Sequence, residues 1–392
     1  MRLRAVAVGV ALLVFAAACA ASGGATPGAD AKLAPVQQIE PSPREHTTSA
    51  LDRPDAEGLP APLVDPKEIL SGGPPPDGIP ALDHPTFVRA SDVTYLKDRE
   101  PVLVLQLGAD ARAYPIEIMT WHEIVNDTVD DTPVAVSYCP LCNSAIAYDR
   151  RLGIRILDFG TSGKLYQSAL VMYDRQTESL WSHFTAQAVA GVLTGERLGT
   201  IPVATVSWGD WRRAHPHGLV LSRDTGYDRP YGRNPYPGYD DIHNPPFLFH
   251  GKVDGRLAAK ERVTGLRSGD DAVAIRFADL KKRRVVETAI AGLDVVAWLQ
   301  PGTASALDSD SVAGGHDVGA TGVFQPLVDG QHLNFDSTKK GFRDRETRSS
   351  WDVLGRATSG PLAGRALTPV EHVDTFWFAW AAFLPNTRIA PA

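Results

Sequence analysis

The feature that most constrains this 392-residue chain is an internal repeat. Residues 174–181 read Asp-Arg-Gln-Thr-Glu-Ser-Leu-Trp, and residues 344–351 repeat five of these eight positions at an offset of 170. With one residue deleted, further positions recur at an offset of 169, namely Gly191/Gly360, Leu193/Leu362, Gly195/Gly364, Leu198/Leu367, Trp208/Trp377, Trp211/Trp380 and Pro216/Pro385. Because tryptophan is rare, three paired tryptophans at near-constant spacing indicate two similar units.

We therefore divide the folded part into a first unit, 86–225, and a second unit, 263–392, joined by a Tyr/Pro/Gly-rich connector, 226–262. Short apolar runs at 101–107 and 132–138 predict strands, and 116–125 has the spacing of a helix. Long helical patterns are missing. The expected fold is β-rich α+β, with two homologous lobes that arose by tandem duplication.

The N-terminal residues are typical of an exported protein. Two arginines among the first four residues precede an apolar run, which predicts a signal peptide over 1–18. Cys19 follows three alanines, as in a bacterial lipobox, so we expect a lipoprotein anchored to a membrane of the cell envelope through Cys19. An ordinary signal peptide with an incidental cysteine is the alternative. Residues 19–85 contain few large apolar side chains, which predicts a lipid anchor followed by a disordered linker.

Charge and motifs exclude several classes of function. The net charge of −7 and the lack of any Lys/Arg block argue against a nucleic-acid partner. The sequence has no GxGxxG or P-loop pattern, so no nucleotide cofactor is expected. HExxH and GxSxG patterns are also missing, which removes the usual signs of a zinc protease or an α/β-hydrolase.

Two cysteines remain after Cys19, in the run Tyr-Cys-Pro-Leu-Cys-Asn at 138–143. Alignment of 113–140 on 274–301, at an offset of 161, places Cys139 opposite Gln300 and Cys142 opposite Thr303. The same alignment pairs His122 with Arg283, so all three potential ligands are absent together from the second unit. Two thiolates and an imidazole suit copper first and zinc second. We expect a soft-metal site of Cys139, Cys142 and His122, used for metal binding, delivery or sensing. His183 is a further candidate ligand, because Val353 takes its place in the second unit.

Two alternatives stay open. The cysteine pair could be the dithiol of an extracytoplasmic thiol/disulfide oxidoreductase. The residues after Cys142 predict a strand, which argues against a thioredoxin fold. The protein could instead be a non-enzymatic binding module that holds a small molecule or a protein in the cleft between its lobes, beside the connector tyrosines Tyr227, Tyr231, Tyr236 and Tyr239. The repeated Asp174–Trp181 motif predicts a structural turn, with Arg175 paired to a carboxylate and Trp181 in the core.

Several long motifs resemble one family. They are the run 121–127 (WHEIVND), the run 138–144 (YCPLCNS), the turn 158–163 (DFGTSG), the run 170–181 (LVMYDRQTESLW) and the run 376–383 (FWFAWAAF). Together they resemble the bacterial and archaeal family known as domain of unknown function 3179, over essentially all of the chain after the linker. The resemblance implies export or lipid anchoring and carries no established activity.

Overall fold

The computed structural model describes residues 32–390. Strands dominate this part of the chain, so the predicted β-rich α+β class is confirmed. Its α-helices have seven residues each: α1 (Ile116–His122), α2 (Trp208–Ala214), α3 (Phe277–Arg283) and α4 (Trp377–Phe383). The predicted signal peptide and Cys19 lie outside the described residues.

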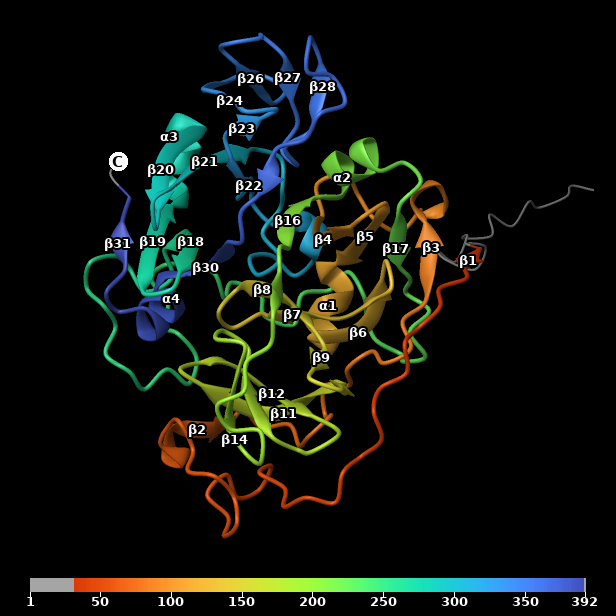
Figure 1. Cartoon of the computed structure of the whole chain (residues 1–392), viewed down its shortest axis with the longest axis vertical. Coiled ribbons are helices and arrows are strands. Elements are labelled where there is room, and N and C mark those ends of the chain that lie inside the picture. Colours follow the sequence, from red (N-terminus) through yellow and green to blue (C-terminus); the bar gives the residue numbers. More distant parts are fainter. Residues whose placement is uncertain (1–31, 391–392) are drawn as a thin grey trace, which may run out of the picture.

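The first unit is built from three sheets (Figure 1). One has the order β1 (Leu33–Ala34), β3 (Phe87–Arg89), β17 (Leu219–Leu221), β5 (Asp110–Pro115), β4 (Pro101–Leu107), β16 (Ala204–Ser207). The next has the order β15 (Thr200–Ile201), β8 (Ser144–Asp149), β7 (Thr132–Cys139), β6 (Ile124–Val129). The last has the order β14 (Gln187–Ala190), β13 (Leu180–Ser182), β12 (Ala169–Asp174), β11 (Phe159–Tyr166), β2 (Ile69–Ser71), and β9 (Arg151–Leu152) pairs separately with β10 (Arg155–Ile156).

The second unit has three corresponding sheets. Their orders are β30 (Val373–Phe376), β18 (Arg262–Ser268), β19 (Asp271–Arg276), β31 (Arg388–Ile389); then β20 (Val285–Ile290), β21 (Leu293–Gln300), β22 (Ala320–Gln325), β29 (Thr368–Pro369); then β25 (Phe335–Ser337), β26 (Phe342–Asp344), β27 (Ser350–Trp351), β28 (Ala357–Ser359). The pair β23 (Leu327–Val328) and β24 (Gln331–His332) and the 3-10 turns η1 (Pro66–Glu68), η2 (Ala90–Asp92) and η3 (Val312–Gly314) complete the secondary structure.

The two units share their strand order and their register. The order β16-β4-β5-β17 ends in a parallel β5/β17 pair, and β30-β18-β19-β31 ends in a parallel β19/β31 pair. Strand β6 pairs with β7 in the register in which β20 pairs with β21. Helices α1 and α3 both end at a residue with positive φ, Glu123 at 59° and Arg284 at 69°. Residues 161 positions apart therefore occupy equivalent places in these elements, as the sequence alignment predicted.

The repeated motif forms a structural turn in both units. The carboxylate of Asp174 accepts hydrogen bonds from the backbone N–H of Thr177 (2.6 Å) and the indole of Trp181 (2.8 Å). Asp344 accepts the matching bonds from Thr347 and Trp351. Both tryptophans are buried. The prediction of a structural turn is confirmed, and Arg175 pairs with Asp77 and Asp83 as expected.

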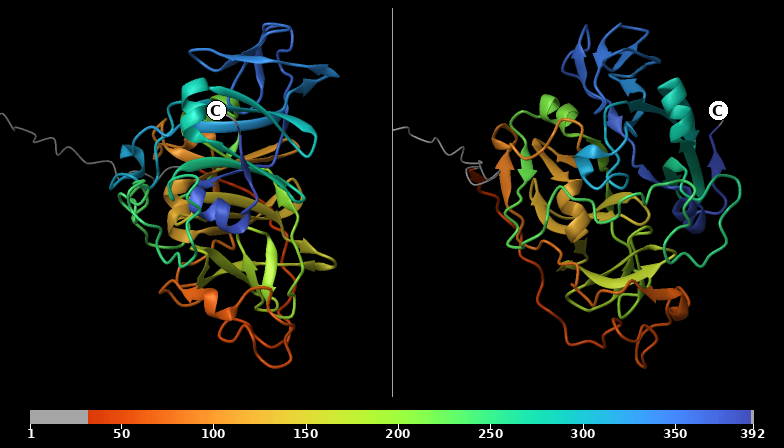
Figure 2. Two further views of the ribbon diagram at one scale, coloured as in Figure 1. Left: turned by 90° about the vertical axis from the view of Figure 1, so that its left-hand side faces the viewer. Right: turned by 180° about the vertical axis from the view of Figure 1, so that it is seen from behind.

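The apolar cores cross the boundary between the units. One core combines the first unit's β6–β8 and β11–β14 layers with Trp377 and Trp380 of α4 in the second unit. Another combines Trp208 and Trp211 of α2 with the second unit's β21–β22 and β25–β28 layers. Each tryptophan helix contacts strands of its own unit, α2 contacting β4 and β16 and α4 contacting β18 and β30, and its tryptophans extend that core to the other unit. The sheets β11–β14 and β25–β28 lie at opposite ends of the molecule (Figures 1 and 2). The sequence predicted two lobes without predicting these shared cores.

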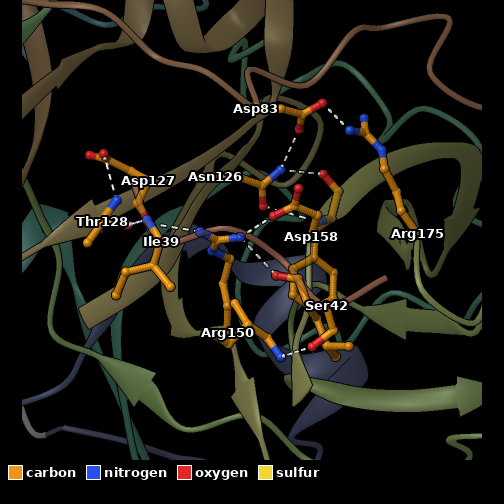
Figure 3. A network of polar contacts seen from close by, with 12 residues as sticks. Ile39, Ser42, Asp83, Asn126, Asp127, Thr128, Arg150, Asp158 and Arg175 are labelled. Carbon is orange, nitrogen blue, oxygen red and sulfur yellow. Dashed lines mark hydrogen bonds and ion pairs between the residues drawn. The ribbon is translucent and has the colours of Figure 1, made fainter. Parts of the chain in front are cut away.

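Residues 32–85 differ from the predicted disordered linker. They follow the outside of the first unit and add strands to its sheets, since β1 pairs with β3 and β2 with β11. Ser42 donates its backbone N–H to Ile156 (2.8 Å), and Ile39 donates to the Thr128 hydroxyl (2.8 Å; Figure 3). Hydrogen bonds to sheet edges position a segment that has too few apolar side chains for a core of its own.

Candidate functional site: a buried cysteine pair

Cys139 and Cys142 lie in the hairpin between β7 and β8. Cys139 ends β7, and Asn143, at a φ of 51°, turns the chain into β8. Both cysteines are free thiols, and their side chains are essentially unexposed. A strand follows Cys142, as predicted, where a thioredoxin-like site would begin a helix.

A chain of hydrogen bonds leads from Cys142 to His183. The Sγ of Cys142 lies 3.0 Å from the hydroxyl of Ser144, which lies 2.8 Å from Nε2 of His183. The other ring nitrogen, Nδ1, lies 3.0 Å from the hydroxyl of Ser137. Tyr148 donates its hydroxyl to the backbone carbonyl of His183. The structure thus connects His183 to the cysteine pair through Ser144, and no sequence pattern had singled out Ser144.

The two sulfurs have different acidities. Burial by itself would raise the pKa of Cys139, but hydrogen bonds from the Cys142 thiol and from nearby backbone N–H groups lower it below the ordinary cysteine value. The pKa of Cys142 is raised well above that value, by burial and by its hydrogen bond to Cys139. Of the two thiols, Cys139 is therefore the one that loses its proton more readily.

Glu123 is a buried acid beside this pair that the sequence analysis missed. Burial raises its pKa well above the ordinary glutamate value, and the negative charge of Cys139 raises it further. Burial consequently favours the neutral form of the Glu123 acid. The alignment of the two units could have indicated Glu123 as a site residue. Like the cysteines, it is not kept in the second unit, where Arg284 is its counterpart.

His122 has a different role from the one predicted. Its Nδ1 lies 2.7 Å from the Pro80 carbonyl oxygen, and its Nε2 lies 2.6 Å from the hydroxyl of Tyr231. Across residues 32–390, the one group of three close metal-binding side chains is Asp240, Asp308 and His316. The structure therefore does not gather Cys139, Cys142 and His122 around one point, and copper or zinc binding stays a prediction.

The connector and the second unit cover the cysteine hairpin. The hydroxyl of Tyr239 donates to the Leu141 carbonyl (2.9 Å), while Thr375 and Phe376 of β30 donate to the Cys142 carbonyl (2.8 and 3.0 Å). A cavity of about 40 Å³, lined by Asn143 and residues of both units, lies beside the hairpin and has room for little more than water. Of the connector tyrosines proposed to line a cleft, Tyr231, Tyr236 and Tyr239 are part of the packing, and Tyr227 is exposed.

A family model described as "protein of unknown function (DUF3179)" matches residues 76–387. The chain belongs to this family. The DUF3179 match covers the first unit with its cysteine hairpin, the connector, and the second unit up to residue 387. Neither the comparison with curated proteins nor that with solved structures gave a match. In the part of this DUF3179 protein that the structure describes, no helix has the length and apolar character needed to cross a membrane.

The burial of His183 predicts a loss of stability in acid. Desolvation lowers the pKa of His183 from 6.5 to about 3, so the unfolded chain binds a proton that the folded chain does not. The free energy of unfolding should fall as the pH drops from 6.5 towards 3, with a slope of about 1.4 kcal/mol per pH unit for this group.

Denaturant unfolding at several pH values measures this slope. His122 and His215, whose pKa values are each lowered to about 4, should contribute similarly. A His183→Gln variant should keep the contributions of His122 and His215 to the pH dependence and lose that of His183. Equal slopes in the variant and the wild type would contradict the assignment.

Proposed function

We propose that this protein is a thiol–disulfide oxidoreductase in which Cys139 attacks and Cys142 resolves. The observation that carries the proposal is a buried pair of free cysteines in one hairpin, in which the Cys142 Sγ lies 3.0 Å from the Ser144 hydroxyl, the pKa of Cys139 is lowered and the pKa of Cys142 is raised. Thiol–disulfide exchange needs one thiolate and one neighbouring thiol, whereas a metal site needs both thiols deprotonated.

The exchange can be written with the groups at hand. The Cys139 thiolate attacks a substrate disulfide, a mixed disulfide forms, and the departing sulfur takes the proton of Glu123. Cys142 then gives its proton to the Glu123 carboxylate and attacks the Cys139 sulfur, which releases the second substrate sulfur as a thiolate. The substrate disulfide is reduced by two electrons, and the Cys139–Cys142 pair is oxidised to a disulfide. The reverse sequence oxidises a substrate dithiol.

Ser144 and His183 are positioning residues in this scheme. The Ser144 hydroxyl contacts the Cys142 sulfur and can stabilise the thiolate that forms during the second step. His183 stays neutral and fixes the orientation of that hydroxyl. Because both sulfurs are buried, a substrate reaches them only when the hairpin separates from its cover, which consists of Tyr239 of the connector and strand β30 of the second unit.

A redox titration tests the proposal. Protein that begins at residue 20 is equilibrated in glutathione buffers of graded potential, the free thiols are trapped in acid, and intact masses are measured. We expect one reversible two-electron transition between the dithiol and an intramolecular disulfide. The absence of a disulfide under every buffer condition would refute the proposal.

A soft-metal site is the second candidate, favoured by two free cysteines in one hairpin. Cys139 and Cys142 would be the ligands, and His122 would hold the connector instead. Elemental analysis of the freshly purified protein separates the two candidates. About one equivalent of copper or zinc, lost in a Cys139→Ser/Cys142→Ser variant, would favour the metal.

The cellular setting proposed is the cell envelope, with a lipid anchor on Cys19 after removal of residues 1–18. The basic and apolar N-terminal residues support it. A Cys19→Ala variant should lose labelled palmitate and leave the membrane fraction, whereas unchanged fractionation would contradict the anchor. A tandem duplication is proposed as the origin of the two units, supported by their matching strand order and by the sequence repeat.

A further inference from the structure

The first unit contains a groove that the chain itself fills. Residues 77–83 lie between β6 and β11, where Leu82 adds to the free edge of β6 as a short parallel strand. Its backbone N–H donates to Ile124 (2.9 Å), and its carbonyl accepts from Asn126 (2.8 Å). His122 bonds to the Pro80 carbonyl oxygen in the same segment. With this cover every residue of β6 is buried.

The side chain of Asp83 is held by two donors at the end of this strand. Asn126 donates its side-chain amide to one carboxylate oxygen (2.8 Å), and Arg175 pairs with the other (Figure 3). Because Asn126 and Arg175 both present hydrogen-bond donors to this position, a side chain that only accepts hydrogen bonds fits there. The carboxylate of Asp83 is such a side chain.

The corresponding groove of the second unit is open. It lies between β20 and β25, has a volume of about 570 Å³, and is lined by Val285, Glu287, Phe335 and Arg345 among others. The counterparts of the Ile124 carbonyl and the Asn126 N–H are the Val285 carbonyl and the Glu287 N–H. Within residues 32–390, neither of these has a backbone partner on the outer edge of β20. Glu287 is exposed, whereas Asn126 is buried.

We infer that this groove binds an extended peptide segment, which adds to β20 as a parallel strand in the way that Leu82 adds to β6. An unpaired edge supplies main-chain hydrogen bonds to such a segment. Arg283, the counterpart of His122, lines the groove. In the first unit His122 bonds to the Pro80 carbonyl oxygen, so Arg283 could donate to the equivalent carbonyl of the bound peptide. The inference does not depend on the chemistry of the cysteine pair.

The side chains of the groove predict one residue of the ligand. At the position equivalent to Asp83, the peptide side chain would face Glu287 and Arg345 in place of Asn126 and Arg175. An acceptor next to a donor selects an amide, which donates to Glu287 and accepts from Arg345. Arg345 forms an ion pair with Asp336 (2.8 Å). Because this pair is exposed, it is weak, and Arg345 can also donate to the peptide. The ligand should therefore carry Asn or Gln where the first unit has Asp83.

Peptide binding tests both parts of the inference. Two fluorescently labelled octapeptides serve as probes. The Asn peptide has the sequence of residues 78–85 with Asn in place of Asp83, and the Asp peptide has the unchanged sequence. Wild-type protein should bind the Asn peptide about tenfold more tightly in fluorescence anisotropy, because the aspartate would face Glu287. A Glu287→Asn variant recreates the donor pair of the first unit and should reverse the preference.

A Glu287→Pro variant removes the outward N–H from an edge strand and should lose both peptides. Its unfolding transition should match that of the wild type. Binding of neither peptide by wild-type protein at about 1 mM, or unchanged binding by Glu287→Pro, would overturn the inference. A concentration-dependent dimer that Glu287→Pro abolishes, without peptide binding, would also overturn it and would assign the groove to a second copy of the chain.

Discussion

An Asp127→Ala variant should lose about 3 kcal/mol of unfolding free energy, the lower end of the usual cost of removing one partner of a buried ion pair. Asp127 is fully buried and accepts two hydrogen bonds from Arg112 (2.6 and 2.7 Å) and one from the hydroxyl of Tyr114 (2.7 Å). Its removal leaves the Arg112 guanidinium, which is 4% exposed, with Asp110 as its remaining ion-pair partner. With an unfolding entropy of about 2.1 cal/mol/K per residue, Tm should fall by roughly 4 °C.

The second unit supplies the controls for this prediction. Val273, Ile275 and Thr288 occupy the places of Arg112, Tyr114 and Asp127, so that unit folds without the buried ion pair. A Thr288→Ala variant should change the unfolding free energy by less than about 1 kcal/mol. The triple change Arg112→Val, Tyr114→Ile, Asp127→Thr should recover most of the loss, because apolar residues can replace a buried ion pair. Chemical denaturation of the four proteins measures these differences, and a triple variant less stable than Asp127→Ala would contradict the argument.

A Cys139→Ser variant should lose the thiol reactivity of the reduced protein. In the wild type the pKa of Cys139 is lowered, and the pKa of Cys142 is raised well above its ordinary value. Because the thiolate is the form that reacts, the remaining Cys142 should react with iodoacetamide more slowly than Cys139 does in the wild type. Timed alkylation under native conditions, followed by peptide mass spectrometry, gives the two rates.

The reciprocal variant distinguishes attack from resolution. Cys142→Ser keeps a hydroxyl beside the Cys139 sulfur, so the protein should accumulate a mixed disulfide with glutathione that it cannot resolve. A Ser144→Ala variant should form this species at the wild-type rate and resolve it more slowly, because it loses the contact to Cys142. Equal alkylation of both cysteines in the wild type would contradict the assigned roles.

Much of the local structure could be predicted from the sequence, because it depends on residues close together in the chain. The turn at Asp174 and the strand after Cys142 are of this kind. The equivalence of Cys139 and Gln300 followed from an ungapped alignment, and the strand registers agree with it.

The site depends on contacts that no local pattern encodes. His122 and His183 were both candidates, and only tertiary packing connects His183 to Cys142 through Ser144 while it directs His122 to Pro80. Glu123 was missed because an isolated glutamate at a helix end is usually exposed. Residues 32–85 were misjudged because apolar content predicts a core and does not report backbone bonds to an existing sheet edge, such as that of Ser42 to Ile156.

The cores that the two units share have an evolutionary consequence. Trp377 and Trp380 lie in one core with residues of the first unit, and Trp208 and Trp211 lie in one core with residues of the second, so separating the units would expose apolar surface on both. If the units arose by the proposed tandem duplication, an ancestor with one unit per chain would have covered this surface by assembling as a homodimer with two identical grooves and two identical hairpins. Gene fusion would then have let one copy keep its cysteines and fill its groove while the other lost the cysteines and left its groove open.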